Sequence, residues 1–220
     1  MSPTKTKRPN KSINADAPHR LRSPSGGTPP TVMPTTALWE RIDVPGHDAC
    51  QLVQVKDGWK LQGMAVFRHE VGPASIEYLV ECDLDWQCRS GQIRGWLGAH
   101  KWQLVIQRSE NGSWSLNNSP VRGLQGCVDL DYGFTPATNL TQLRRIDIEI
   151  GRSVDVPVAW IDLPEATLSL LPQRYERRSS KSYWYESSAA DYAGLIEVAD
   201  SGFAKNYPGL WRMVSGVSST

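Results

Sequence analysis

Asp129 and Asp131 are the residues whose type and spacing most clearly permit chemistry. They are two positions apart, so on an extended strand both carboxylates would lie on one face. Two carboxylates on one face can hold a metal ion or act as an acid/base pair. They can equally be solvated, cap a turn or pair with Arg144 and Arg145, and the sequence leaves these alternatives open.

A bend is predicted directly after this acidic segment, at residues 135–139. The short side chains of Thr138 and Asn139 can satisfy the backbone of the bend or hydrogen-bond a ligand. If the following segment is extended, Arg144 and Arg145 point to opposite faces, so one of them faces the interior. A buried arginine requires a carboxylate or a ligand phosphate as its partner.

Trp86 and Arg89 form a second candidate, because an aromatic ring and a nearby cation can receive a headgroup or a sugar. The alternative is a turn at the end of a strand, with Trp86 packed on the sheet. We assign no catalytic residue, metal ligand or cofactor, because no G-x-S-x-G, H-E-x-x-H or Walker sequence occurs. The lack of these motifs weighs against an enzyme without excluding one.

Strands must position these side chains, because apolar and polar residues alternate over much of the chain after Ala37. Turn signals separate the runs, for example at 56–58 and 200–202, which is typical of an antiparallel meander that closes or rolls up. The predicted strands lie around 59–65, 76–81, 93–96, 102–107, 113–116, 145–150, 154–161, 166–170, 174–176, 183–186, 192–198 and 204–207.

The helical signal is confined to residues 138–143. Thr138 or Asn139 can cap this segment, and Leu140 and Leu143 would lie on one face of it. So short a helix is marginal alone, so we expect the surrounding sheet to hold it.

Composition separates a leader, a domain and a tail. Residues 1–36 are basic and rich in Pro, Ser and Thr, and such a composition buries too little surface to order a chain, so we expect a disordered leader. We place one domain at 37–214 and a flexible tail at 215–220. The net charge of +1 weighs against nucleic acid as a partner, because phosphate binding requires a cationic excess.

Targeting and redox signals are sparse. The sequence contains no run of about 18 apolar residues, so it predicts no membrane-spanning segment. The first residues also lack the apolar stretch of a secretory signal. The four Cys contain no C-x-x-C pair and are expected to be reduced and buried. We therefore expect a cytoplasmic protein.

The order of these clusters along the chain resembles the bacterial family of putative glycolipid-binding domains, from about Trp39 to Arg212. The segment from Gly126 to Arg145 is the most specific part of the resemblance. The chain departs from the family at residues 141–143, where Thr-Gln-Leu replaces the usual Leu-Pro-Ile. Further residues that carry the resemblance are Pro45, Gly46, Tyr78, Asp83, Trp86, Arg89, Trp160, Pro164, Gln173, Arg174, Tyr175, Tyr185, Asp200, Ser201, Gly202, Tyr207, Pro208, Gly209 and Leu210.

The resemblance implies a mostly β fold: a spiral β-roll, in which one long many-stranded antiparallel sheet wraps around a single α-helix. It also implies a homodimer and a lipid or glycolipid ligand, and it adds Gln173 and Tyr175 to the candidate ligand-binding residues. A concave sheet that carries Trp, Tyr and a few polar groups would suit acyl chains and a sugar.

Three hypotheses follow. The first is a non-catalytic binding module for a lipid or glycolipid on the concave face. Its proposed ligand contacts are Trp86, Arg89, Asp129, Asp131, Thr138, Asn139, Arg144, Arg145, Gln173 and Tyr175. The second is a hydrolase-like enzyme that uses Asp129 and Asp131. The third is a dimeric scaffold, in which Asp129 and Arg145 form a buried pair that stabilises the roll.

Overall fold

Fourteen antiparallel strands form the main sheet of residues 34–217, the part of the chain that the computed structural model describes. The strands are β1 (Thr35–Arg41), β2 (Gly46–Val55), β3 (Gly58–His69), β4 (Gly72–Cys82), β5 (Cys88–Leu97), β6 (His100–Arg108), β7 (Trp114–Leu116), β8 (Ser119–Val121), β10 (Ser153–Asp155), β13 (Arg174–Ser179), β14 (Ser182–Ser187), β15 (Tyr192–Val198), β16 (Ala204–Tyr207) and β17 (Trp211–Val217).

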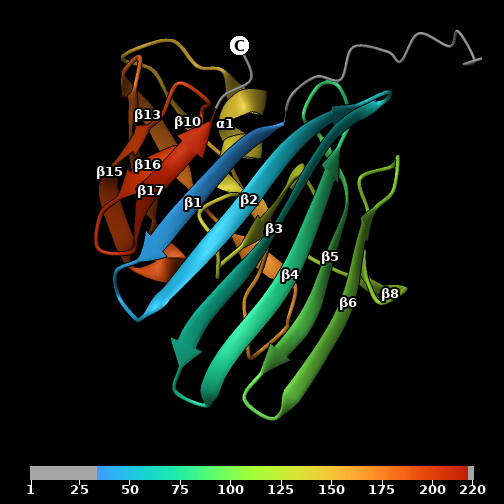
Figure 1. The fold of residues 1–220 in the computed structure, drawn as a ribbon. Coiled ribbons are helices and arrows are strands. Elements are labelled where there is room, and N and C mark those ends of the chain that lie inside the picture. The colour runs from blue at the N-terminus through green and yellow to red at the C-terminus, as the bar shows by residue number, and fades with distance from the viewer. Residues whose placement is uncertain (1–33, 218–220) are drawn as a thin grey trace, which may run out of the picture. The chain divides into compact units, whose positions relative to one another are not determined.

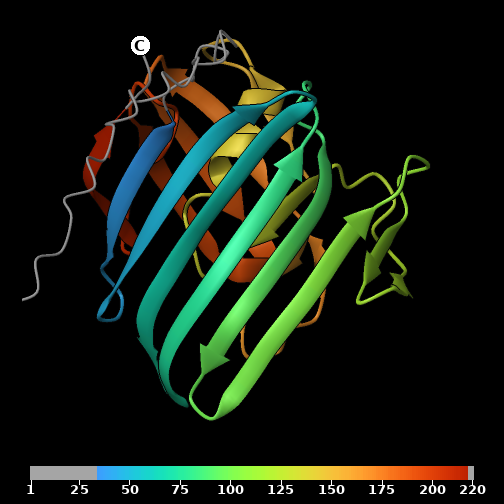
Figure 2. The same cartoon turned by 45° about the vertical axis from the view of Figure 1, so that its right-hand side comes forward.

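The main sheet is built from two runs of consecutive strands that meet at β1. Strands β1 to β8 follow one another as a meander, and β13 to β17 form a second run that ends beside β1. Figures 1 and 2 show the sheet curling so that the two runs lie on either side of the helix. The three-residue strands β8 and β10 lie at the two edges, so the sheet rolls up without closing.

A small second sheet and one α-helix lie on the inner side of the roll. Strands β9 (Asp129–Tyr132), β11 (Val158–Ile161) and β12 (Ser169–Leu171) form this sheet, in which β9 and β11 run parallel. The helix α1 (Asn139–Ile146) follows β9. Within the described residues α1 is the one α-helix, and with eight residues it is too short to cross a membrane.

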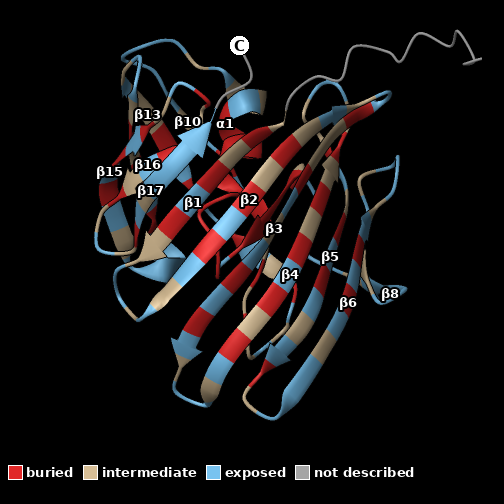
Figure 3. Cartoon of the chain, in the orientation of Figure 1, coloured by how far each residue is buried: buried red, intermediate tan, exposed pale blue. Residues whose placement is uncertain are grey.

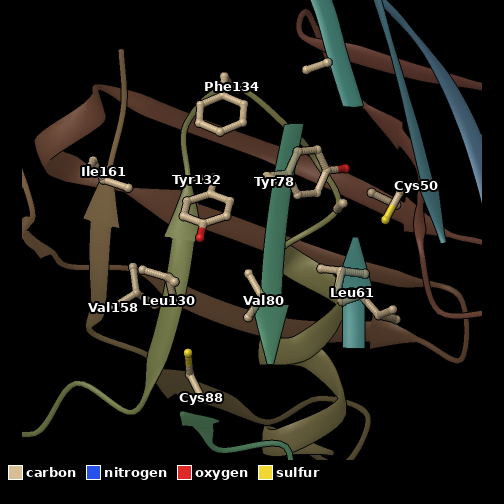
Figure 4. Close-up of a cluster of buried hydrophobic side chains, with 14 of the residues drawn as sticks. Cys50, Leu61, Tyr78, Val80, Cys88, Leu130, Tyr132, Phe134, Val158 and Ile161 are labelled. Atoms are coloured by element: carbon tan, nitrogen blue, oxygen red, sulfur yellow. The ribbon is translucent and has the colours of Figure 1, made fainter. Parts of the chain in front are cut away.

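Alternation along the strands separates core from surface, which Figure 3 shows as stripes across β1 to β6. Figure 4 shows the inner layer, where Leu61 and Val80 of the main sheet face Leu130 and Tyr132 of β9. These residues belong to one continuous hydrophobic cluster that includes Leu140 of α1. The side of the main sheet that faces the helix is therefore filled by side chains.

The predicted fold class, a mostly β roll with a long antiparallel sheet around one helix, is confirmed, and the small sheet is an addition to it. The helix predicted at 138–143 is present and continues to Ile146. The strand predicted at 145–150 was wrong. The helix includes Arg145 and ends at Ile146. The next residue, Asp147, has a left-handed backbone and caps the helix by donating its N–H to the carbonyl of Leu143.

Two other predicted strands differ clearly in extent, and the first, predicted at 166–170, is confined to Ser169–Leu171. The strand predicted at 154–161 is two strands, β10 and β11, separated by Pro157, which has no N–H to donate to a ladder. Strands β1, β2, β8, β9 and β17 were not predicted. The predicted leader lies outside the described residues except for 34–36, and the structure places Thr35 in β1 and Val217 at the end of β17.

Candidate functional site

The two carboxylates of β9 are buried on the same side of that strand, as their spacing predicted. Asp129 forms a bidentate ion pair with Arg145. Nε of Arg145 lies 2.9 Å from Oδ1 of Asp129, and Nη2 lies 2.7 Å from Oδ2. The side chain of Asp129 is fully buried, whereas that of Arg145 is 26% exposed. Burial raises the pKa of Asp129, and the hydrogen bonds from Arg145 limit that rise.

Asp131 has a different set of partners, all of them neutral. Oγ1 of Thr138 donates to Oδ1 of Asp131 over 2.5 Å, and Nε2 of Gln173 donates to Oδ2 over 2.8 Å. Thr138 is the residue before α1, but its hydroxyl bonds to Asp131 and makes no capping bond to the helix. Burial raises the pKa of Asp131, and these hydrogen bonds oppose the rise.

A short hydrogen-bond chain continues from α1 to β13. Nδ2 of Asn139 donates to the hydroxyl of Tyr175, which donates to Oε1 of Gln142, both over 2.8 Å. Two buried polar atoms beside this chain lack a partner among the described residues: Nε2 of Gln142 and Oε1 of Gln173. We call these three neighbouring sets of hydrogen bonds, around Asp129, Asp131 and Tyr175, the interior polar network.

A third buried carboxylate, Asp48 of β2, was missed by the sequence analysis. The hydroxyl of Tyr78 lies 2.8 Å from Oδ2 of Asp48, and Thr135 also donates to that oxygen. Burial raises the pKa of Asp48 to about 6, against the lowering effect of the hydrogen bonds from Thr135 and Tyr78. A polar residue at an inward position of an alternating strand was the available signal, since Asp48 and Cys50 share a face.

The structure brings Trp86 together with Arg144, and it places Arg89 elsewhere. The Arg144 guanidinium lies 5.9 Å from the centre of the Trp86 ring, and both side chains line a cavity of about 320 Å³. Arg89 is exposed on β5 and lines two other hollows, one beside Trp59 and one beside Trp114. Trp86 and Arg89 therefore do not form the joint platform that the sequence suggested.

A larger cavity, of about 780 Å³, opens on the outer face of β1 to β5, the face turned away from the helix. We call it the outer groove. Two cross-strand rows of side chains form its floor: Leu38, Ala49, Met64, Glu77 and Arg94 in one, and Thr36, Gln51, Gln62, Leu79 and Gln92 in the other. Nε2 of Gln62 donates to Oε1 of Gln51 over 3.1 Å, so an amide pair crosses the groove beside apolar side chains.

The predicted contact residues thus fall into three places: the interior network, the Trp86 cavity and, for Arg89, the surface of β5. Their ligand-binding role stays a prediction. The oxygens of Asp129 and Asp131 already accept hydrogen bonds from protein groups. Among residues 34–217, no group of three or more His, Cys, Asp or Glu side chains is arranged to hold a metal ion.

Comparison with known proteins agrees with the architecture. A family model described as "Putative glycolipid-binding" matches residues 36–213. The crystal structure of a DUF1089 family protein from Pseudomonas aeruginosa is similar in fold, with a TM-score of 0.66 and 21% sequence identity. The similarity covers 88% of this chain and 98% of that one. No curated protein matches the chain.

Proposed function

Because the chain belongs to the family described as "Putative glycolipid-binding", we propose that it binds a lipid or glycolipid without catalysing a reaction on it. The observation that carries the proposal is the outer groove, whose volume of about 780 Å³ suits a ligand of substantial size. The groove combines the two chemistries that an amphiphile requires. Leu38, Met64 and Leu79 offer apolar surface, and the amides of Gln51 and Gln62 offer hydrogen bonds to sugar hydroxyls.

The outer groove replaces the inner, concave side of the roll as the proposed ligand surface. The inner side is occupied by one hydrophobic cluster and by the interior polar network, so a ligand there would have to displace packed groups. The outer rows have no such covering within the described residues. Leu38 is 36% exposed and Met64 is 40% exposed, and they flank Ala49 on the same sheet face, so apolar surface there is open to a ligand.

Native mass spectrometry of the full chain, purified without detergent, tests this function. We expect an adduct with the mass of a lipid or glycolipid. In Ala49→Trp, the indole would fill the groove between Leu38 and Met64, so the adduct should be lost. The matched control is Ser75→Trp, on the outer face of β4 but outside the groove lining, which should retain it.

The outcomes test lipid binding and the groove as its site separately. An adduct that persists in Ala49→Trp would contradict the groove as the site. No adduct, together with no binding to lipid vesicles by the wild-type protein, would contradict the function. The same spectrum tests the homodimer, which we also propose from the family resemblance. The enzymatic alternative and the cytoplasmic location stay predictions.

A further inference from the structure

We propose that the cavity beside the C-terminal end of α1 is a second binding site, which takes a phosphoryl group. We call it the arginine cavity. It has a volume of about 320 Å³ and is lined by Trp86, Arg144, Arg177, Lys181 and Tyr183, among others. The site does not depend on the outer groove, because the two share no lining residue.

Arg144 is held in place while most of its donors stay free. Its Nη2 donates to the carbonyl of Ser201 over 2.8 Å, which is its one hydrogen bond to residues 34–217. A Cβ on Gly202 would lie 3.3 Å from Nε of Arg144, so the absence of a side chain there lets the guanidinium lie close to the backbone. No carboxylate of the described residues pairs with Arg144, and a guanidinium presents five N–H donors.

Trp86 lies beside this guanidinium, with its ring centre 5.9 Å away, and is itself rigidly placed. Its ring stacks on Trp59, with the ring centres 4.4 Å apart. Its backbone has a φ of 64°, which is costly for a bulky residue. The turn that holds it is braced by Asp83, whose Oδ1 accepts hydrogen bonds from the N–H groups of Asp85 and Gln87. Backbone strain of this kind is concentrated at ligand-binding sites, which agrees with the place of Trp86 in the cavity lining.

Two further cations complete the lining. Nη1 of Arg177 donates to the carbonyl of Ile148 over 2.8 Å, and its ion pair with Asp147 is long, at 3.6 Å. Lys181 contacts Asp200. The side chains of both aspartates are 88% exposed, so water screens their charges more than it screens the partly buried Arg177.

The charge balance favours an anion. Three cations face two exposed carboxylates in the lining. The C-terminal end of α1 adds a partial negative charge, which the basic residues of its last turn, Arg144 and Arg145, offset. A guanidinium group can donate paired hydrogen bonds to the oxygens of a phosphoryl group. One phosphoryl group can therefore accept hydrogen bonds from Arg144 and Arg177 at once. Such a phosphoryl group is present both in a free phosphate ester and in the headgroup of a phospholipid.

Calorimetric titration of the full chain with inorganic phosphate, against chloride at matched ionic strength, tests the site. We expect saturable binding that Arg144→Gln and Arg177→Gln each weaken about tenfold or more, since each removes a charge-assisted hydrogen bond. Arg174→Gln is the matched control and should bind as the wild type does, because Arg174 pairs with Asp155 at an exposed position. Thermal melts establish that each variant is folded, and Trp86→Phe replaces Arg144→Gln if the latter fails to fold.

Vesicles distinguish the two sources of phosphate. Binding to phosphatidylcholine vesicles that contain phosphatidic acid, but not to phosphatidylcholine alone, would identify a lipid headgroup if Arg144→Gln abolishes it. Binding of inorganic phosphate without vesicle binding would identify a soluble phosphate ester. Ala49→Trp should bind phosphate normally, so failure of the groove proposal leaves this one standing. Absence of saturable phosphate binding and of Arg144-dependent vesicle binding would overturn the proposal, as would equal losses in Arg144→Gln and Arg174→Gln.

Discussion

The buried acidic residues differ in what neutralises them. Asp129 has an arginine, whereas Asp131 and Asp48 have only neutral donors. A buried carboxylate without a cation loses its hydration with little compensation, so its pKa rises and its charge destabilises the fold at neutral pH. Burial thus raises the pKa of all three carboxylates, and only at Asp129 does an ion pair oppose the rise.

Removing Arg145 should destabilise the protein strongly. Arg145→Ala leaves the fully buried Asp129 without its ion pair, and breaking such a pair costs about 3–5 kcal/mol of unfolding free energy. The partial exposure of Arg145 favours the lower end of that range. Urea denaturation measures the effect. Arg174→Ala, at the exposed pair with Asp155, is the control and should cost less than about 1 kcal/mol. Equal losses would show that Asp129 does not depend on the pair.

Asp48 should make stability depend on pH in a defined direction. Its pKa is about 6 in the folded protein and 3.8 in the reference state, so the folded state binds the proton more tightly. The resulting stabilisation is complete below pH 3.8 and is lost as the pH rises through about 6, by about 3 kcal/mol in all. Asp48→Asn should flatten this dependence between pH 4 and 7, as measured by chemical denaturation. Asp162, whose pKa is also raised to about 6, contributes in the same direction and remains in the variant. An unchanged slope in Asp48→Asn would contradict the assignment.

At the scale of the elements, the small sheet can press against the main sheet because a glycine lies at the contact. The hydroxyl of Tyr132 in β9 donates to the carbonyl of Leu79 over 3.0 Å, across the position of Gly91 in β5. A Cβ on Gly91 would lie 2.2 Å from Leu130 and 2.3 Å from the Tyr132 hydroxyl. The position of β9, and with it the two aspartates, therefore depends on this residue.

Gly91→Ala should consequently destabilise the protein by about 1–3 kcal/mol, the usual cost of overpacking a filled core. Thermal or urea denaturation measures the loss. Gly216→Ala in β17 is the control, because its Cβ would lie 3.1 Å from Met213 and 3.3 Å from the Thr36 carbonyl, both longer than the contacts at Gly91, and it should cost less stability. A neutral Gly91→Ala would mean that β9 can shift away from the main sheet at no cost.

At the scale of the whole molecule, curling of the sheet encloses one of its faces in the core and leaves the other face exposed. The inner face builds one hydrophobic cluster with β9, β11 and α1, which gives the fold its stability. The outer face of β1 to β5 needs no packing partner to complete that core, so its side chains are available for a ligand. The same strands of the open roll thus enclose the core on one face and, in our proposal, present the ligand surface on the other.

Local sequence patterns determined much of the outcome. Period-two alternation identified many of the strands, and the spacing of Asp129 and Asp131 placed them on one face. A cap candidate followed by the spacing of Leu140 and Leu143 located the helix. These features depend on backbone geometry over a few residues, which is why a single sequence reveals them. Local patterns also failed in places: five strands were not predicted, and the strand predicted at 145–150 begins where the helix continues to Ile146.

Only the tertiary structure decided which side of the strands is filled and which residues meet. Thr135 reaches Asp48 across 87 positions, Gln173 reaches Asp131 across 42, and Trp86 lies over Arg144. Alternation of apolar and polar residues predicts that a strand has two different faces. The order of the strands and the curl of the sheet determine which face is enclosed. The outer groove and the arginine cavity exist because the roll brings together distant segments, and no pattern within one segment records that meeting.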